Sequence, residues 1–374
     1  MTRELVQSMG DHRAPVSIGS GILTSIAQRV RSANGGCDPT RVLIVCDTAV
    51  EASSARAVAE SWATSGVPVS VVAIHASEAN KSIASWQQIM SSAIEARLDR
   101  KSCIVAVGGG IVTDLAGFAA ASFLRGVPWV AVPTTLLGMV DAALGGKTGV
   151  NLTLADGSLG KNLAGAFWPP CAVICDVDAL ASLPLRQFRA GLAECLKHAM
   201  IADPSIEPLL GGIAESYTTG DAGDQWRLID LVSRSAAVKL AVVARDPRES
   251  GERMLLNLGH TFAHAIEAHL ASDVLHGEAV ALGLVAAGFA SASSGRLTSL
   301  EAEGVRGRVA ALGFEVRLPR AVPLERLEMA AGLDKKQVGG AMTLILPERS
   351  GTAAVVRQAD RAWLRAGFIA IGAS

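Results

Sequence analysis

The sequence predicts an α/β fold in which a doubly wound parallel sheet forms the first part and a mostly α-helical domain follows. Short apolar runs alternate with longer amphipathic stretches up to about residue 178, and helical patterns dominate after it. The Pro169-Pro170 pair and the last apolar run mark the junction. The length of 374 residues also favours two domains. We therefore expect domains at residues 1–178 and 179–374.

Five short runs rich in β-branched residues are the expected strands of the sheet. They are residues 42–46, 69–74, 103–107, 129–132 and 172–175. Each run is apolar throughout instead of alternating, which is typical of parallel strands that are covered on both faces. Amphipathic stretches at 50–64, 81–98 and 111–124 separate them and are the expected helices of the β-α-β units.

The second part carries helical periodicity and little strand signal. The expected helices are residues 183–200, 225–244, 257–270, 277–294 and 300–312. The longest nearly unbroken apolar run, residues 279–290, is twelve residues long, whereas a membrane-spanning helix needs roughly 20. We expect a buried helix there and no contact with a membrane.

Composition excludes several classes of protein. Hydrophobic residues make up 50% of the chain and charged residues 18%, which argues against disorder. Lys and Arg number 34 against 35 Asp and Glu, so the chain lacks the basic excess of a nucleic-acid-binding protein. The N-terminus has no hydrophobic signal core, and the six cysteines form no CxxC motif. We expect a reduced, cytoplasmic protein.

A glycine turn is the first candidate binding feature. Gly108, Gly109 and Gly110 follow the third strand run directly and open the next helix, where backbone N–H groups and the helix dipole favour a phosphate. The spacing is not GxGxxG and no acidic residue follows about 20 positions later, so the usual dinucleotide fingerprint is missing. Tight packing explains the turn equally well. Asp47, at the end of the first run, is either a turn residue or a ligand of a ribose hydroxyl.

A histidine cluster is the second candidate. His260 and His264 are four residues apart and share a helical face, His276 follows closely, and Glu194 lies upstream. Two imidazoles and a carboxylate are typical of a catalytic zinc site with an open fourth position. A single histidine would more often be an ordinary core or surface residue. His260, His264 and His276, which are three of the seven histidines, all fall in one stretch of 17 residues, and this clustering favours a metal.

Basic residues beside glycine-rich turns are candidate contacts for anionic oxygens. Lys147 and Lys161 both follow a glycine directly. Taken one at a time, such lysines are most often solvated surface charges. Lys197 lies one helical turn after Glu194 in an apolar helix, so it is either the ion-pair partner of that glutamate or a catalytic lysine.

Seven ordered motifs extend over nearly the whole chain. They are GGGIVTDLAGFAAASFLRG (108–126), VPTTLLGMVDAALGGKTGVN (132–151), LGKNLAGAF (159–167), RAGLAECLKHAMIADP (189–204), RESGERMLLNLGHTFAHAIEA (248–268), LHGEAVALG (275–283) and DKK (334–336). In this order they resemble the 3-dehydroquinate synthase family of sugar phosphate cyclases. The resemblance implies a Rossmann-like N-terminal NAD domain, a helical metal-binding C-terminal domain, an active site in the cleft and a homodimer.

The resemblance also implies a reaction. The family members are lyases of the shikimate pathway, which leads to chorismate and the aromatic amino acids. They convert 3-deoxy-D-arabino-heptulosonate 7-phosphate into 3-dehydroquinate and phosphate. NAD⁺ takes a hydride from the C5 alcohol, phosphate leaves by β-elimination, the hydride returns, and an intramolecular aldol step closes the carbocycle. NAD is thus regenerated in each turnover, and a divalent metal, zinc or alternatively cobalt, holds the substrate hydroxyls.

Residue roles follow from the matched motifs. The implied metal ligands are Glu194, His260 and His276. The implied catalytic residues are Asp141, Lys147, Lys197, Asn257 and His264. The implied substrate contacts are Arg125, reaching the neighbouring subunit, and Asn162, Lys239, Arg253 and one of Lys335 and Lys336. The implied cofactor contacts are Asp47, Glu78, Lys81, Gly109, Gly110, Asp114, Thr134, Thr135, Lys147, Lys161 and Ser182.

Two departures from the family pattern stand in one segment. About five residues are inserted between the GKTGVN and GKN motifs, in the stretch 152–159, and residues 155–158 are expected to form a turn. Leu152 also stands where many members have a polar residue. Neither departure removes a matched functional side chain.

Three other functions are compatible with parts of the sequence. A sister cyclase such as aminodehydroquinate synthase differs only subtly from the family pattern. A metal-dependent alcohol or glycerol dehydrogenase has a similar fold and uses NAD, but lacks the paired GGKTG and GKN motifs because it binds no phosphorylated substrate. A non-catalytic relative would have damaged ligands, whereas Glu194, His260 and His276 are all present here.

Overall fold

The chain folds into two units. The computed structural model describes residues 1–32, 37–155, 157, 159–219, 225–249, 251–332 and 342–374. Unit 1 comprises Met1–Leu183 and Gln225–Pro247, and unit 2 comprises Pro184–Asp224 and Arg248–Ser374. The sequence predicted a single boundary at 178/179. The structure divides the chain at Leu183 and also groups helix α8 (Gln225–Arg245) with unit 1, because α8 packs against the N-terminal strands.

A seven-stranded sheet forms the centre of unit 1. Its order is β1-β2-β9-β6-β5-β3-β4. The strands are β1 (Thr2–Met9), β2 (His12–Gly19), β3 (Val42–Asp47), β4 (Val69–Ile74), β5 (Cys103–Gly108), β6 (Trp129–Pro133) and β9 (Ala172–Asp176). Only β1 is antiparallel to its neighbour. The five predicted strands are confirmed to within one residue. The β1-β2 hairpin was missed because polar residues interrupt it and β1 is an edge strand.

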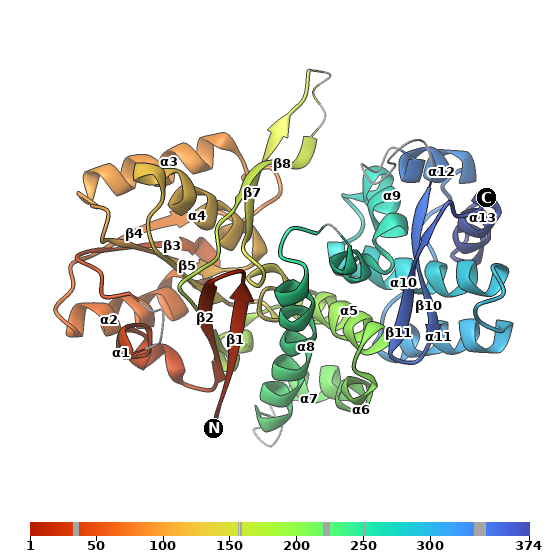
Figure 1. Ribbon diagram of the computed structural model, residues 1–374, viewed down its shortest axis with the longest axis horizontal. Coiled ribbons are helices and arrows are strands. Elements are labelled where there is room, and N and C mark those ends of the chain that lie inside the picture. The colour runs from red at the N-terminus through yellow and green to blue at the C-terminus, as the bar shows by residue number, and fades with distance from the viewer. Residues whose placement is uncertain (33–36, 156, 158, 220–224, 250, 333–341) are drawn as a thin grey trace. The chain divides into compact units, whose positions relative to one another are not determined.

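Helices cover both faces of this sheet (Figure 1). Helices α3 (Ile83–Glu95) and α4 (Gly110–Ser122) lie on one face, and α1 (Ile26–Ser32) and α2 (Arg56–Thr64) lie on the other. Val30 of α1 and Trp62 of α2 pack into one buried apolar cluster with alternate residues of the strands, such as Ile44. The β-α-β prediction is therefore confirmed in its layers as well as in its elements.

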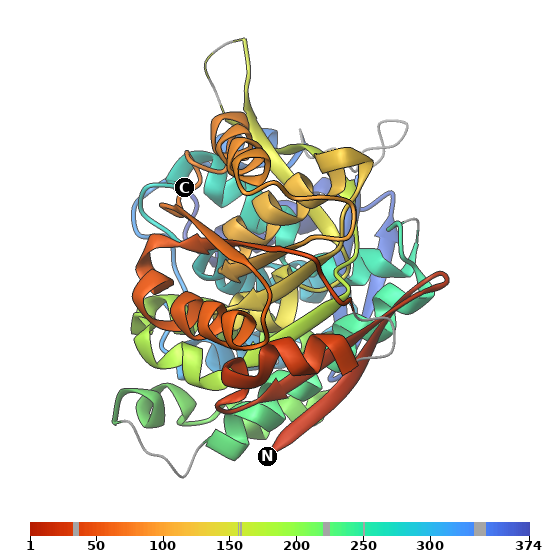
Figure 2. The same ribbon diagram turned by 90° about the vertical axis from the view of Figure 1, so that its left-hand side faces the viewer.

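Two further strands of unit 1 form a separate hairpin. β7 (Lys147–Thr153) and β8 (Leu159–Phe167) pair in antiparallel fashion. The β7 strand packs against α4, and the far end of the hairpin projects beyond the helices of unit 1 (Figure 2). The sequence analysis missed both strands, since their glycine-rich motifs resemble loops. A Cβ atom added at Gly165 would lie 2.1 Å from the backbone oxygen of Thr148, so the pairing requires glycine there. Gly157 donates to the Leu154 carbonyl at 2.9 Å, as a turn requires, whereas residues 156 and 158 lie outside the described part.

Unit 2 is mainly helical. The α-helices described in it are α5 (Leu185–Ile201), α6 (Glu207–Leu210), α7 (Ile213–Thr219), α9 (His260–Leu270), α10 (His276–Ser293), α11 (Ser299–Ala311), α12 (Leu324–Gly332) and α13 (Arg361–Ala370). Helices α5, α9, α11 and α13 pack around α10, which confirms the prediction of a buried helix there. Within the described residues, none of the helices combines the length and the apolarity that crossing a membrane requires.

One expectation for the second part was wrong. The strand signal was judged to fade after residue 178, yet β10 (Thr343–Arg349) and β11 (Thr352–Arg357) form an antiparallel hairpin in unit 2. Short apolar runs of this length do not distinguish a strand from a helical segment. The β10 strand is stabilised by packing against α10, which no local pattern reveals.

Glycines allow α10 to lie unusually close to its neighbours. A Cβ atom at Gly277 would lie 2.1 Å from the carbonyl oxygen of Ala190 in α5, and one at Gly283 would lie 2.2 Å from that of Gly259. Both contacts are with backbone atoms, which cannot move without moving a helix.

We expect Gly277→Ala to lower the free energy of unfolding by at least about 2 kcal/mol, because overpacking against a rigid backbone forces the helices apart. Gly304→Ala is the matched control, since Gly304 is also in a helix of unit 2 but has no atom within 4 Å of an added Cβ. That variant should be neutral or up to about 1 kcal/mol more stable. Thermal or urea unfolding measures both. Equal stability of the two variants would contradict the close contact.

Candidate functional site

Three side chains of unit 2 bring their ligand atoms together. Glu194 lies within α5, and His260 and His276 are the first residues of α9 and α10. One ligand atom from each lies within 4.8 Å of the other two. Oε1 of Glu194 is 3.7 Å from Nε2 of His260 and 3.8 Å from Nε2 of His276. The structure thus assembles the carboxylate and the two imidazoles that the sequence singled out.

The remaining ring nitrogens are held by second partners. Nδ1 of His260 lies 3.2 Å from the carbonyl oxygen of Leu258. Because a carbonyl only accepts, this Nδ1 donates, which leaves Nε2 with its lone pair on the side of Glu194. Nδ1 of His276 lies 3.4 Å from Oε2 of Glu267, in the same arrangement. Partners of this kind orient metal-binding histidines. Sequence reasoning missed Glu267, although it lies one helical turn from His264 and two from His260.

Burial of Glu194 is the observation that tests whether a metal ion fits. Its side chain is 0% exposed, and Oε1 accepts no hydrogen bond from the described residues. Oε2 forms an ion pair with Lys197, which is 1% exposed. A buried carboxylate oxygen without a partner is costly, and a cation among the three ligand atoms satisfies it. An N₂O donor set of this kind suits a divalent ion of the zinc class.

The other candidate residues of unit 2 differ in their burial and in their contacts. His264 is exposed and its ring centroid is 5.6 Å from that of His260, so it lies next to the donor set and outside it. Asn257 donates to Oε1 of Glu249 at 2.7 Å. Arg253 is only 2% exposed, which is unusual for a guanidinium. Lys335 and Lys336 lie outside the described residues.

Candidate cofactor residues of unit 1 gather at the carboxyl ends of neighbouring strands. Asp47 ends β3, Gly109 and Gly110 follow β5, and Thr134 and Thr135 follow β6. The chain runs from β3 to β4 on one side and then returns to β5 on the other side of β3. In doubly wound sheets, ligands bind outside the carboxyl ends at such a reversal. The fold therefore brings this part of the predicted cofactor set to one edge.

Local contacts explain the glycines and threonines of this edge. A Cβ atom at Gly109 would lie 3.1 Å from the methyl group of Thr135, and the Thr134 N–H donates to the Gly108 carbonyl at 2.9 Å. No side chain of the described residues caps the N-terminus of α4, so its first N–H groups remain available to an anion. Oδ1 of Asp47 accepts a hydrogen bond from the Ala49 N–H at 3.1 Å, so this residue stabilises the turn after β3. Its other carboxylate oxygen remains for a ligand.

A polar network connects the β7-β8 hairpin to the rest of unit 1. Lys81, only 5% exposed, forms an ion pair with Asp114 and donates to Oδ1 of Asn162. Asn151 donates to Oε2 of Glu78 at 2.9 Å and accepts from the Asn162 N–H at 2.9 Å. Four of these five residues were predicted. Asn151 was missed as a site residue, and its signal was its place at the end of the GKTGVN motif.

Desolvation dominates the electrostatics of Asp114. Burial raises the pKa of its carboxyl group above the ordinary value, and the adjacent Lys81 ammonium opposes this effect. The ion pair with Lys81 therefore offsets part of the desolvation of this carboxyl group. Lys81 therefore acts, in this structure, as the partner of Asp114 and Asn162.

The remaining predicted residues of unit 1 are more dispersed. Lys239 of α8 is 7% exposed and forms an ion pair with Asp141, so the structure joins a predicted substrate contact to a predicted catalytic residue. Lys147, Lys161 and Arg125 are exposed. Ser182, also exposed, donates to the carbonyl of Ala179 at 3.5 Å.

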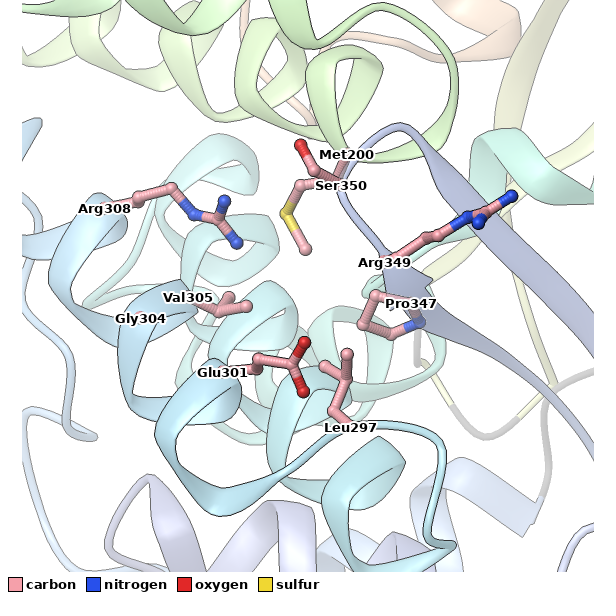
Figure 3. A pocket seen from close by; sticks show the side chains of 9 residues that line it. All are labelled: Met200, Leu297, Glu301, Gly304, Val305, Arg308, Pro347, Arg349 and Ser350. Carbon is pink, nitrogen blue, oxygen red and sulfur yellow. The ribbon is translucent and has the colours of Figure 1, made fainter.

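A pocket of about 400 Å³ elsewhere in unit 2 is separate from these residues (Figure 3). It is lined by Met200, Leu297, Glu301, Gly304, Val305, Arg308, Pro347, Arg349 and Ser350. Two of its charged groups have structural partners, since Arg308 pairs with Glu207 at 3.0 Å and Glu301 caps α11. None of the predicted site residues lines it, so it does not bear on the chemistry.

Comparison with known proteins identifies the family. The family model described as 3-dehydroquinate synthase N-terminal matches residues 71–190, and the model described as 3-dehydroquinate synthase C-terminal matches residues 191–337. The chain belongs to the 3-dehydroquinate synthase family. The 3-dehydroquinate synthase of Symbiobacterium thermophilum is 38% identical over 376 residues, which cover 97% of this chain and 99% of that protein. That of Halorhodospira halophila is 40% identical, with 93% of each chain covered.

Solved structures of similar proteins have the same fold. The 2-epi-5-epi-valiolone synthase of Streptomyces hygroscopicus, solved with NAD⁺ and Zn²⁺ bound, has a TM-score of 0.84 and 26% identity. The match covers 98% of this chain and 99% of that one. This chain and that synthase therefore share a fold, and the sequence predicted its parallel-sheet part and its helical part.

We expect His276→Ala to weaken binding of a divalent metal by at least about a hundredfold, because loss of a ligand costs more than the 10–100-fold typical of second-shell changes. The measurement is zinc content of the purified protein, with calorimetric titration of the metal-free form. His264→Ala is the control, since it removes an exposed histidine of the same cluster that lies outside the donor set. It should keep the metal content of the wild-type protein, and loss of metal from it alone would contradict the assignment.

Proposed function

We propose that this chain is a 3-dehydroquinate synthase. It converts 3-deoxy-D-arabino-heptulosonate 7-phosphate into 3-dehydroquinate and phosphate, and NAD is reduced and reoxidised within each turnover. Relatives that carry this name align with the chain over nearly its whole length. The proposal extends to the lyase class and to the shikimate pathway.

One observation carries the proposal. The chain has both a Glu-His₂ donor set in unit 2 and two glycine motifs with exposed Lys147 and Lys161 on the β7-β8 hairpin of unit 1. An NAD-dependent dehydrogenase of this fold uses a metal but has no phosphate to bind. The lysine-bearing hairpin is therefore the feature that favours a cyclase.

The residues of unit 2 suit the binding of a hydroxylated, anionic substrate. A divalent cation held by Glu194, His260 and His276 supplies Lewis-acid polarisation of a substrate hydroxyl. Lys197 forms an ion pair with Oε2 of Glu194 and holds that carboxylate in orientation. The buried guanidinium of Arg253 provides paired donors for a carboxylate, and Glu249 orients the Asn257 amide.

The residues of unit 1 suit a dinucleotide and a departing phosphate. NAD, when bound at the carboxyl edge of the sheet, supplies a reversible hydride acceptor. The N–H groups at the start of α4 hold a phosphate of that cofactor. Lys147 and Lys161 stabilise the charge that develops on the leaving phosphate, since charge-assisted contacts of this type are the strong ones.

Three finer assignments complete the proposal. Zinc is the native metal, because two imidazoles and a carboxylate are a usual zinc donor set, which also tolerates cobalt. The active form is a homodimer in which Arg125, exposed at the end of a 3₁₀ turn, reaches the substrate of the neighbouring subunit. The protein acts in the cytoplasm, a location supported by the free thiols of all six cysteines, which the structure describes.

Phosphate release at limiting NAD tests the function. Purified protein, metal and sugar phosphate are mixed with NAD far below the substrate concentration. Phosphate should form in many equivalents per NAD, and the absorbance of NADH should not rise with product. Accumulation of one NADH per substrate without phosphate would establish a dehydrogenase. Turnover only with an amino-substituted sugar phosphate would establish the aminodehydroquinate alternative.

We expect Lys147→Ala and Arg253→Ala each to lower kcat/KM at least about tenfold, because one charge-assisted contact contributes roughly 1.5–3 kcal/mol. Lys101→Ala is the control. It removes an exposed lysine just before β5, on the amino side of the sheet, and should leave the kinetics unchanged. Normal kcat and KM in both test variants would exclude them from substrate binding.

A further inference from the structure

Three cysteines of unit 1 gather at the edge of the sheet opposite Asp47 and Gly109. Cys103 is the first residue of β5, and Cys171 directly precedes β9, so both lie at the amino ends of parallel strands. Cys37 lies in the segment before β3. The three come from distant parts of the sequence, and none of them belongs to the family motifs described above.

The sulfur atoms lie close enough together to share one metal ion. The three Sγ atoms lie within 4.8 Å of one another. The Cys171 thiol donates to Sγ of Cys37 at 3.4 Å. Three thiolates held 2.3 Å from one ion lie about 3.8–4.0 Å apart, within this range. Small shifts of the side chains therefore complete the geometry.

Two of the three thiols are fixed by the sheet. The N–H of Cys103 donates to the Arg41 carbonyl at 2.9 Å, and that of Cys171 donates to the Trp129 carbonyl at 2.8 Å. They stand on the two strands that flank β6. The backbone thus fixes the positions of Cys103 and Cys171, and Cys37 supplies the third sulfur atom.

Burial makes the cluster a shielded site with one accessible side. Cys103 is 0% exposed and Cys171 is 9% exposed, and both belong to the apolar cluster beneath α1 and α2. Cys37 is partly exposed and packs against the same cluster. An ion can therefore enter from the side of Cys37, and apolar side chains of the cluster shield it on the side of Cys103 and Cys171.

We propose that Cys37, Cys103 and Cys171 bind a thiophilic metal ion of the zinc class through three thiolates. Binding releases the three thiol protons to solvent, so that a divalent ion and three thiolates form a centre with one net negative charge. Thiolate ligands select such ions over magnesium or calcium. The ion fastens the segment before β3 to β5 and β9 and stabilises unit 1. This site is additional to the Glu194 donor set and does not depend on the proposed function.

The geometry favours a metal over the two simpler roles of such thiols. A disulfide between Cys37 and Cys171 uses two sulfurs and leaves Cys103 without a role. Buried thiols that only fill space need no mutual contact, and Cys46 and Cys175 show that arrangement elsewhere in the same sheet.

Cobalt(II) titration of the metal-free full chain tests the proposal, with a phosphine reductant that keeps the thiols reduced. Only sulfur ligands give an intense thiolate-to-cobalt charge-transfer band in the near ultraviolet, and the Glu194 set contains no sulfur. The wild-type protein should show this band and bind two cobalt ions per chain. His276→Ala should keep the band. Cys37→Ser should lose it or weaken cobalt affinity at this site at least about a hundredfold. Cys46→Ser, a buried thiol outside the cluster, should keep it.

Thermal unfolding gives an independent readout. In the His276→Ala background, excess Zn²⁺ should raise the Tm by about 4 °C or more, because it binds the folded state more tightly than the unfolded chain. Adding Cys37→Ser should remove that rise while the double variant still unfolds cooperatively.

Absence of the charge-transfer band in folded, reduced wild-type protein would overturn the proposal and leave three core thiols. Formation of a Cys37–Cys171 disulfide with peroxide, without metal binding, would overturn it in favour of a redox pair.

Discussion

The buried carboxylate of Glu194 is the constraint around which unit 2 is organised. A charge with no exposure to water costs several kcal/mol unless other charges and donors compensate it. Lys197 supplies one partner from the same helix, and two imidazoles approach the other oxygen from α9 and α10. Their convergence requires close helix packing, and the residue that permits the closest backbone contact, Gly277, directly follows His276. The residue that permits the helix packing and a residue of the Glu-His₂ donor set are therefore adjacent in the chain.

Unit 1 separates two kinds of chemistry at the two ends of one sheet. The carboxyl ends of β3, β5 and β6 are followed by polar and glycine residues, as is usual at ligand-binding edges of doubly wound sheets. The amino ends bear the three thiols. The opposite ends of a strand such as β5 are about 20 Å apart, so one edge can be tied together without restricting the other.

The β7-β8 hairpin shows how a glycine-rich motif can be structural and functional together. Gly149 and Gly165 allow two strands to pair at very short range, which leaves the flanking Lys147 and Lys161 exposed. The network of Glu78, Lys81, Asp114, Asn151 and Asn162 then anchors the hairpin to its unit. Several residues that resemble cofactor contacts in the motif therefore also act as structural partners of one another.

The sequence by itself determined the five parallel strands, most helices, the family and the Glu-His₂ set, because each depends on local periodicity or on motifs that persist in order. It did not predict the β1-β2, β7-β8 and β10-β11 hairpins, the grouping of α8 with unit 1, or the roles of Glu267 and Asn151. Nor did it bring Cys37 together with Cys103 and Cys171. Those features arise from pairing between segments far apart in the chain. Local side-chain patterns report whether a face is buried, whereas only the tertiary structure decides which distant residue buries it.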